Sequence, residues 1–196
     1  KKLKAAKPHM VIAVCGCMTQ QGNFSEKLLK SYPCVDMIIG TYNIDKFGEL
    51  LQKKIDSKKR LVEILDKNGE ITEGIKPLRS SFPNAWVNIM YGCNNFCSYC
   101  VVPYVRGRER SRKPENIIEE IKGLLENGYK EITLLGQNVN SYGKDLKSGE
   151  DFAYLLDKIG ELDGKFRLRF MSNHPKDLTE KVVLAIKNNP HACKAI

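Results

Sequence analysis

The sequence lacks any apolar run long enough to cross a membrane. Its longest apolar stretches, such as Met10 to Cys15, are much shorter than the roughly 20 residues that a spanning helix needs. It also lacks the pattern of a signal peptide, since Lys1 opens a lysine-rich, helix-like segment. With seven cysteines and no export signal, we expect a cytoplasmic protein whose thiols serve metal binding or catalysis rather than disulfides.

The composition is that of a globular protein with a basic surface. Hydrophobic residues make up 42% and charged residues 28% of the 196 residues, which is enough for a core in one large domain or two small ones. The net charge of +9 suggests a polyanionic partner. Residues 1–84 carry 15 basic and 9 acidic side chains, and residues 85–196 carry 17 and 14.

Part of the second half's excess charge lies between Arg106 and Lys113, where five basic residues accompany a single acid, Glu109. Aromatic residues stand nearby at positions 96, 99 and 104. Basic and aromatic side chains together are typical of surfaces that bind RNA phosphates and stack bases. From charge alone, a solvated basic loop is the simpler interpretation, and only the position of this segment beside three cysteines favours the RNA hypothesis.

The first part of the chain predicts an open parallel sheet. Residues 10–15 and 35–39 have the apolar character of buried strands, and helical spacing of apolar residues follows each of them, over 24–29 and 44–55. A strand–helix–strand–helix order implies a parallel α/β sheet. Residues 61–65 predict a further strand, followed by a hairpin-like turn at 66–69 and a weak second strand.

We place a linker at residues 77–83 and a domain boundary near residue 80, giving domains 1–80 and 81–196. The second domain predicts repeated strand–helix units. The expected strands span 86–91, 131–135 and 166–170, the expected helices begin near 114, 152 and 178, and the chain ends where a fourth strand is expected. Consecutive units of this kind form a barrel or an arc of one, with the site at the carboxyl ends of the strands.

That rule brings three loops to one edge of the predicted sheet. The loops contain Cys93, Cys97 and Cys100; Gly136, Gln137 and Asn138; and Ser172, Asn173 and His174. A single histidine before a proline is more often a structural hydrogen-bonding group, so we assign His174 no catalytic role.

The three cysteines are spaced to surround one metal centre. Tetrahedral zinc or an all-cysteine cubane needs a fourth thiolate, which this loop lacks, so one iron of a cubane would keep an open position of the kind that catalysis uses. A structural zinc loop with a distant fourth ligand is the alternative. Cys15, Cys34 and Cys193 stand in or beside apolar runs without partner spacing, and we interpret them as structural.

This spacing resembles that of the radical S-adenosylmethionine enzymes. The residues around it, Gly92 to Asn95 and Arg106 to Arg112, resemble the methylthiotransferase family within that superfamily. The segment Gly136 to Gly143 is similar to the branch that modifies isopentenylated adenosine beside the tRNA anticodon. The resemblance extends from about Val11 to the end of the chain. It implies a six-unit partial barrel, of which about half would be present here, preceded by a truncated open-sheet domain.

The resemblance also implies cofactors and their ligands. Cys93, Cys97 and Cys100 would hold a radical 4Fe-4S cluster that cleaves S-adenosylmethionine. Cys17, in the turn 16–20, matches one ligand of a second, auxiliary 4Fe-4S cluster. The two further ligands would precede Lys1, so we expect this chain alone to be unable to complete methylthio transfer.

Further residues are assigned by the same resemblance. Gly136, Gln137, Asn138 and Ser172 would contact S-adenosylmethionine, although serine is expected where Asn173 stands. Arg106, Arg108 and Arg112 are candidates for the cofactor carboxylate or RNA phosphate, because arginine forms fork-like pairs with both.

The implied activity is insertion of a methylthio group at C2 of N6-isopentenyladenosine in tRNA. The implied partners are tRNA and a reducing electron donor of flavodoxin or ferredoxin type, and no membrane is expected. Two alternatives remain: a related enzyme acting on threonylcarbamoyl-adenosine or a ribosomal protein, and a non-catalytic zinc- or RNA-binding module. The sequence leaves the oligomeric state open.

Overall fold

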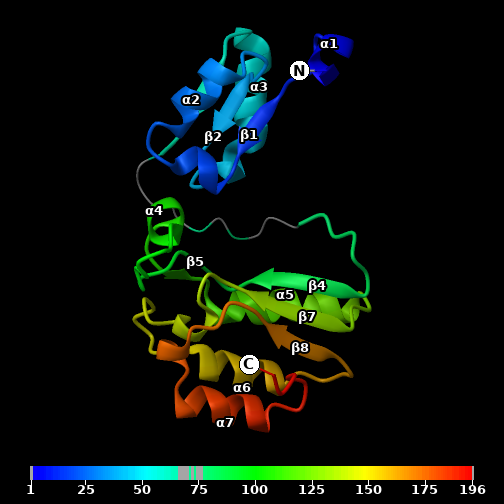
Figure 1. Ribbon diagram of the computed structural model, residues 1–196. Coiled ribbons are helices and arrows are strands. Elements are labelled where there is room, and N and C mark those ends of the chain that lie inside the picture. The colour runs from blue at the N-terminus through cyan, green and yellow to red at the C-terminus, as the bar shows by residue number, and fades with distance from the viewer. Residues whose placement is uncertain (1, 66–70, 72, 74–76, 196) are drawn as a thin grey trace. The chain divides into compact units, whose positions relative to one another are not determined.

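The computed structural model describes residues 2–65, 71, 73 and 77–195, and its helices and strands are drawn in Figure 1. The chain divides into two compact units, residues 1–70 with 94–107 and residues 71–93 with 108–196. The segment with Cys97 and Cys100 therefore packs with the first unit although it lies within the second domain of the sequence. The domain boundary near residue 80 stays a prediction.

The first unit is built on a parallel sheet of three strands. These are β1 (Ala13–Cys15), β2 (Met37–Ile39) and β3 (Leu61–Glu63), adjacent in that order, with Ala13 opposite Met37 and Met37 opposite Leu61. The helical elements of this unit are α1 (Lys2–Ala6), η1 (Cys17–Gln20), α2 (Phe24–Ser31), η2 (Ile44–Lys46), α3 (Phe47–Ser57) and α4 (Val102–Arg106).

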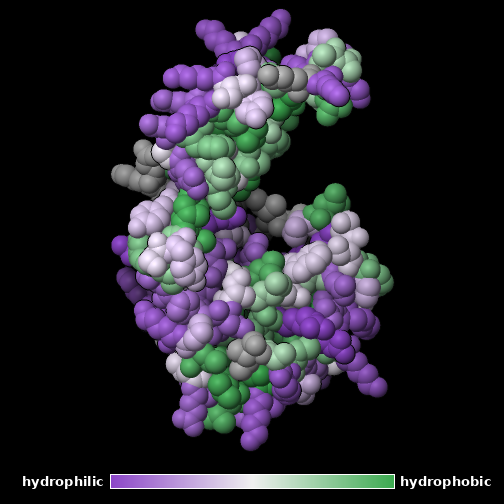
Figure 2. Space-filling model, viewed as in Figure 1, coloured by the Kyte–Doolittle hydropathy of each residue, from purple (hydrophilic) through white to green (hydrophobic). Residues whose placement is uncertain are grey.

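The sequence explains why β2 is central. Its three residues are all apolar and completely buried, as expected for a parallel strand covered on both faces. Phe47, Leu50 and Leu51 recur at helical spacing along α3 and pack against this strand. The polar faces of the helices carry exposed lysines, and Figure 2 shows long hydrophilic side chains projecting from this unit.

The strand expected at residues 61–65 is observed as β3. It extends the sheet in parallel with β2, which places Leu61 against the core formed with Met37 and Leu50. The hairpin after it stays a prediction. The turn predicted at 66–69 lies outside the described residues.

The second unit contains a parallel sheet with the order β4 (Asn84–Asn88), β7 (Glu131–Leu135) and β8 (Arg167–Phe170). Residues near the end of the chain begin a fourth position, since Ala192 forms a parallel bridge with Leu168. The predicted α/β class with parallel sheets is thus confirmed. The other elements are β5 (Met90–Tyr91), β6 (Arg110–Ser111), α5 (Pro114–Glu126), η3 (Val139–Ser141), α6 (Phe152–Gly160), η4 (Pro175–Asp177) and α7 (Glu180–Asn188).

The helices of this unit bury one apolar face each. On α5, Ile117 and Ile121 are completely buried; the helix begins at Pro114, where no backbone donor is needed, and Gly128 follows it with a φ of 86°. Figure 1 shows α6 and α7 on the same side of the sheet, where their buried residues join one core with β4, β7 and β8. None of the described helices is long and apolar enough to cross a membrane.

The basic segment 106–113 is more ordered than the predicted loop. Its residues Arg110 and Ser111 form β6, which pairs antiparallel with β5. Ser111 is buried, and its backbone N–H donates to Asp145 Oδ2 at 2.8 Å. The basic residues are therefore held in different environments and do not act as one solvated loop.

Candidate functional site

In the second unit, two of the predicted loops are joined by a hydrogen bond at the carboxyl ends of the strands. Gln137, after β7, accepts the backbone N–H of Gly92 on its side-chain oxygen at 2.6 Å. Gly92 directly precedes Cys93, which is buried. The side chain of Gln137 is thus committed to the start of the cysteine motif, which leaves its amide nitrogen and main chain as the groups for any ligand.

The third loop joins the same edge. Val139 donates its backbone N–H to the carbonyl of Ser172 at 3.1 Å, and Met171 donates to Leu134. Ser172 is exposed and has a φ of 68°. This left-handed conformation is uncommon for a serine, and such conformations are found preferentially at functional sites.

Gly136 has no room for a side chain. A Cβ atom built there would lie 2.6 Å from Cγ of Met90 and 3.2 Å from Cγ1 of Val139. Met90 itself is almost completely buried. Glycine is therefore required because β5 and η3 approach the backbone closely at this point.

Asn138, a predicted cofactor contact, is buried between the loops after β7 and β8. It is 1% exposed, and its amide nitrogen donates to Asp177 Oδ2 at 2.7 Å. Asp177 also forms an ion pair with Lys144. These contacts connect the loops after β7 and β8 and favour a structural role for the Asn138 side chain. Sequence reasoning missed Asp177, because nothing in its local pattern indicates a buried carboxylate.

The cysteine motif runs from one unit to the other. Cys93 follows β5 in the second unit, whereas Cys97 and Cys100 are half-buried in the first unit. A backbone hydrogen bond of 2.9 Å from Cys100 to the carbonyl of Cys97 closes a turn between these two. Phe96, just before Cys97, has a φ of 46°, a second left-handed residue in a candidate site.

The chemistry of these donors fits an iron–sulfur cluster. All seven cysteines are free thiols, and thiolates are the protein ligands of such clusters. Over residues 2–65, 71, 73 and 77–195, no three His, Cys, Asp or Glu side chains are grouped so as to hold a metal ion. The ligand assignment therefore depends on the identity and spacing of Cys93, Cys97 and Cys100.

Cys17 and Arg106 lie together in the first unit. Cys17 begins η1 directly after the carboxyl end of β1, and Arg106, at the end of α4, donates from Nε to its sulfur at 3.1 Å. Cys15 is exposed, whereas Cys34 and Cys193 are half-buried.

Arg112 has a structural environment. Its side chain is 11% exposed and contacts Glu73 at 3.0 Å, Glu120 at 2.8 Å and the carbonyl of Asn88 at 2.7 Å. Burial alone would lower its pKa, but the hydrogen bonds to Glu120 and Glu73 raise the pKa above the ordinary arginine value. Two carboxylates offset the charge of Arg112, and its hydrogen bond to Asn88 holds the end of β4. These contacts favour a structural role for Arg112 over the predicted binding of a cofactor carboxylate or RNA phosphate. Arg108 is exposed.

His174 accepts the backbone N–H of Lys176 on Nδ1 at 3.2 Å and thereby caps η4. This contact agrees with the structural interpretation of that histidine.

Glu109, the acid among the basic residues, is buried and accepts the hydroxyl of Ser141 at 2.8 Å.

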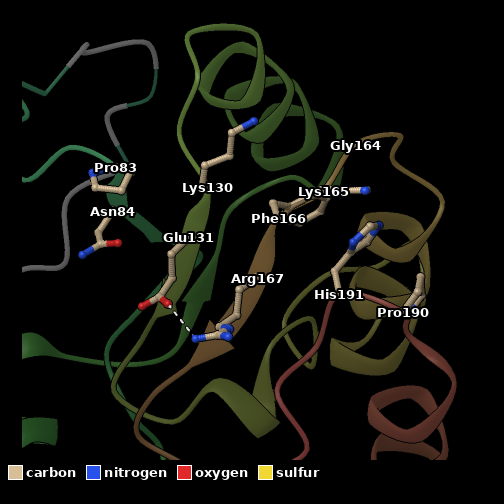
Figure 3. A pocket seen from close by; sticks show the side chains of 10 residues that line it. All are labelled: Pro83, Asn84, Lys130, Glu131, Gly164, Lys165, Phe166, Arg167, Pro190 and His191. Atoms are coloured by element: carbon tan, nitrogen blue, oxygen red, sulfur yellow. Dashed lines mark ion pairs between the residues drawn. The ribbon is translucent and has the colours of Figure 1, made fainter.

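A separate cavity of about 600 Å³ lies at the other end of the second unit's sheet, where the strands begin. Figure 3 shows Lys130, Glu131, Arg167 and His191 around it, with Glu131 paired to Arg167. His191 stacks on Phe166 with ring centroids 3.9 Å apart. None of the predicted site residues lines this cavity.

Comparison with known proteins supports the resemblance drawn from the motifs. The family model of the Radical SAM superfamily matches residues 87–194. The chain is also similar, over its whole length, to tRNA-2-methylthio-N(6)-dimethylallyladenosine synthase from Clostridium tetani, with 56% identity over 196 residues. The proteins of the same name from Clostridioides difficile and Caldicellulosiruptor saccharolyticus are 54% and 51% identical.

These matches cover all or nearly all of this chain but a smaller part of the relatives. The chain spans 43% of the length of the Clostridium tetani protein, 41% of that from Clostridioides difficile and 42% of that from Caldicellulosiruptor saccharolyticus.

Proposed function

Because this chain belongs to the Radical SAM superfamily, we propose that it carries the radical-cluster site of a tRNA methylthiotransferase. Membership implies a 4Fe-4S cluster and S-adenosylmethionine as cofactors. The observation that carries the proposal is the Cys93, Cys97 and Cys100 motif, which lies inside the matched region of a chain 51–56% identical to relatives named for this reaction.

The motif residues have the roles that their chemistry allows. Three thiolates would hold the cluster and leave one iron open to the amino and carboxylate groups of S-adenosylmethionine. When bound, the cluster and S-adenosylmethionine would together supply one-electron chemistry that activates an unreactive C–H bond. Gly136 lets the loop after β7 pack closely against Met90 because it has no Cβ, and Gln137 fixes the backbone at Gly92, where the motif begins.

We assign the cofactor's amino group to the backbone at Gly136 and Gln137. The support is that the side-chain oxygen of Gln137 is already used by Gly92 and that Asn138 faces Asp177. Exposed Ser172 remains a candidate contact. Arg108 is the exposed arginine of the predicted set and is assigned to phosphate.

Cys17 is the candidate ligand of an auxiliary cluster. Its position at the carboxyl end of a parallel strand and the hydrogen bond from Arg106 support this assignment. Cys17 and its exposed neighbour Cys15 supply two thiols, whereas a cubane with one open iron needs three thiolates. The residues of this chain therefore do not by themselves fit that cluster, and no step is assigned to it.

The proposed substrate is N6-isopentenyladenosine in tRNA, supported by the names of the relatives. A reductant of flavodoxin or ferredoxin type would supply the electron. The seven free thiols support a reducing compartment such as the cytoplasm. A related methylthiotransferase with another substrate is the second candidate, which the names of these relatives do not favour.

Anaerobic reconstitution of the chain with iron and sulfide tests the proposal. A brown protein that cleaves S-adenosylmethionine to deoxyadenosine after reduction by dithionite is the expected result. A colourless protein with stoichiometric zinc would instead establish a zinc-binding module.

A further inference from the structure

An exposed apolar surface lies on the first unit, beside but outside the cysteine ligands. Its members are Met18 of η1 and Phe96, Val101 and Tyr104 of the segment that follows the first motif cysteine. We call these four residues the aromatic platform. Tyr104 is 69% and Met18 55% exposed, and exposed groups of this kind mark interaction sites.

The platform is held on a rigid support. The short helix α4 packs against η1, with Val105 buried beneath it. The hydrogen bond from Arg106 Nε to Cys17 Sγ at 3.1 Å fixes this contact. Thr41, which follows β2, also holds α4, because its Oγ1 donates to the carbonyl of Val105 at 2.6 Å. Tyr104 therefore projects from a helix whose other side is fixed.

The aromatic rings are also ordered relative to each other. Phe96 and Tyr104 form an edge-to-face pair with centroids 5.7 Å apart and planes at 89°. Such pairs are favourable beyond the area that they bury. The left-handed backbone at Phe96, with a φ of 46°, holds its ring in this arrangement at a conformational cost.

The charges around the platform identify the partner's chemistry. Residues 16–22 and 94–107 contain no Asp or Glu, and Arg106 is their one charged residue. An aromatic surface whose own segments carry an arginine and no carboxylate suits a polyanion with flat, unpaired bases, because single-stranded RNA is bound by stacking on aromatic rings and by phosphate contacts.

We infer that the aromatic platform binds unpaired bases of single-stranded RNA, with Tyr104 as its main stacking residue. This inference rests on the proposed function, because it names the surface that receives the tRNA loop. Tyr104 is not a cluster ligand, so its removal leaves iron binding intact.

The test measures binding of a fluorescently labelled RNA stem-loop with adenosines in its loop, next to a fully paired duplex of the same length. Tyr104→Ala should weaken stem-loop binding about tenfold, because stacking on one base contributes roughly that much. Tyr104→Phe keeps the ring and should bind like the unaltered chain. Tyr32→Ala is the matched control, since Tyr32 is 50% exposed on the same unit and lies outside the platform.

The outcomes separate the two proposals. If the unaltered chain binds the stem-loop and Tyr104→Ala binds equally well, the platform is overturned while the proposed function stands. If the unaltered chain binds no RNA but still cleaves S-adenosylmethionine, both the platform and the RNA substrate fail. If Tyr104→Ala changes self-association in sedimentation but not RNA binding, the surface contacts a second copy and the inference is wrong.

Discussion

The side chain of Gln137 accepts the backbone N–H of Gly92 at a distance of 2.6 Å. Gln137 lies just after β7, and Gly92 directly follows β5, the short strand that comes after β4; Gly92 is buried. One side chain thus satisfies a donor that would otherwise be buried without a partner, one residue before the first cysteine of the motif.

This hydrogen bond predicts that Gln137→Leu destabilises the second unit. Leaving a buried N–H unsatisfied costs about 1–3 kcal/mol of unfolding free energy. Gln137→Glu keeps an acceptor oxygen and should cost less. The only tryptophan, Trp86, lies in β4, so its fluorescence during urea unfolding reports on this unit. Equal stability of the Leu and Glu variants would show that the hydrogen bond contributes little.

Iron analysis checks the ligand assignment. The reconstituted chain should bind about four irons, the content of one cubane, and Cys97→Ala should lose both the iron and the cleavage of S-adenosylmethionine. Cys193→Ala should retain both, because Cys193 is not among the proposed ligands. About eight irons in the unaltered chain, or a methylthiolated nucleoside after its reaction with tRNA, would mean that further thiols act as ligands.

Gly136→Ala should strain the contact between β5 and the loop after β7. The added Cβ would lie 2.6 Å from Cγ of Met90, and overpacking of a buried site costs about 1–3 kcal/mol. Combining Gly136→Ala with Met90→Ala should cost less than the sum of the single changes, since the clash disappears. Additive losses in urea unfolding would contradict this contact.

The arginines should differ in how they affect the salt dependence of RNA binding. Arg108→Gln should reduce the slope of log affinity against log salt by about one unit, as expected for one lost phosphate contact. Arg112→Gln should leave the slope unchanged, because Glu73 and Glu120 already offset the charge of Arg112. Circular dichroism establishes that both variants are folded. A reduced slope for Arg112→Gln alone would reverse the two assignments.

Asp36 should make the stability of the first unit depend on pH. Burial acts to raise its pKa, but the hydrogen bonds from Lys4 and the backbone of Ile12 and the charge of Lys54 lower the pKa overall. A lowered pKa stabilises the fold above the unfolded value of about 3.9, and this contribution is lost as the pH falls through the folded value. Asp36→Asn should therefore cost about 1 kcal/mol at neutral pH.

Hydrogen exchange of β1 and β2 at two pH values measures that effect. The difference between Asp36→Asn and the unaltered chain should shrink below about pH 4. Asp45→Asn, on η2 in the same unit, is the comparison variant. A difference of the same size at neutral and at acidic pH would remove the electrostatic explanation.

The sequence by itself determined the parallel α/β class and the family. Three patterns carried this information, and each involves residues that are close together in the sequence. They are the continuous apolar run of β2, the helical spacing of Ile117 and Ile121 on α5, and the spacing of the three cysteines. Patterns of this kind are local, because each residue type must suit the face that its own strand or helix buries.

Only the tertiary structure decided which polar residues contact each other. Arg112 pairs with Glu73, which is 39 residues away in the chain, Asn138 pairs with Asp177, and Arg106 reaches Cys17. No local pattern indicates such partners, because a side chain's hydrogen bonds depend on what the fold brings to it. For the same reason only the fold decided that β3 pairs in parallel with β2, because the apolar pattern around Leu61 does not specify a neighbouring strand and the core around Met37 and Leu50 selects one.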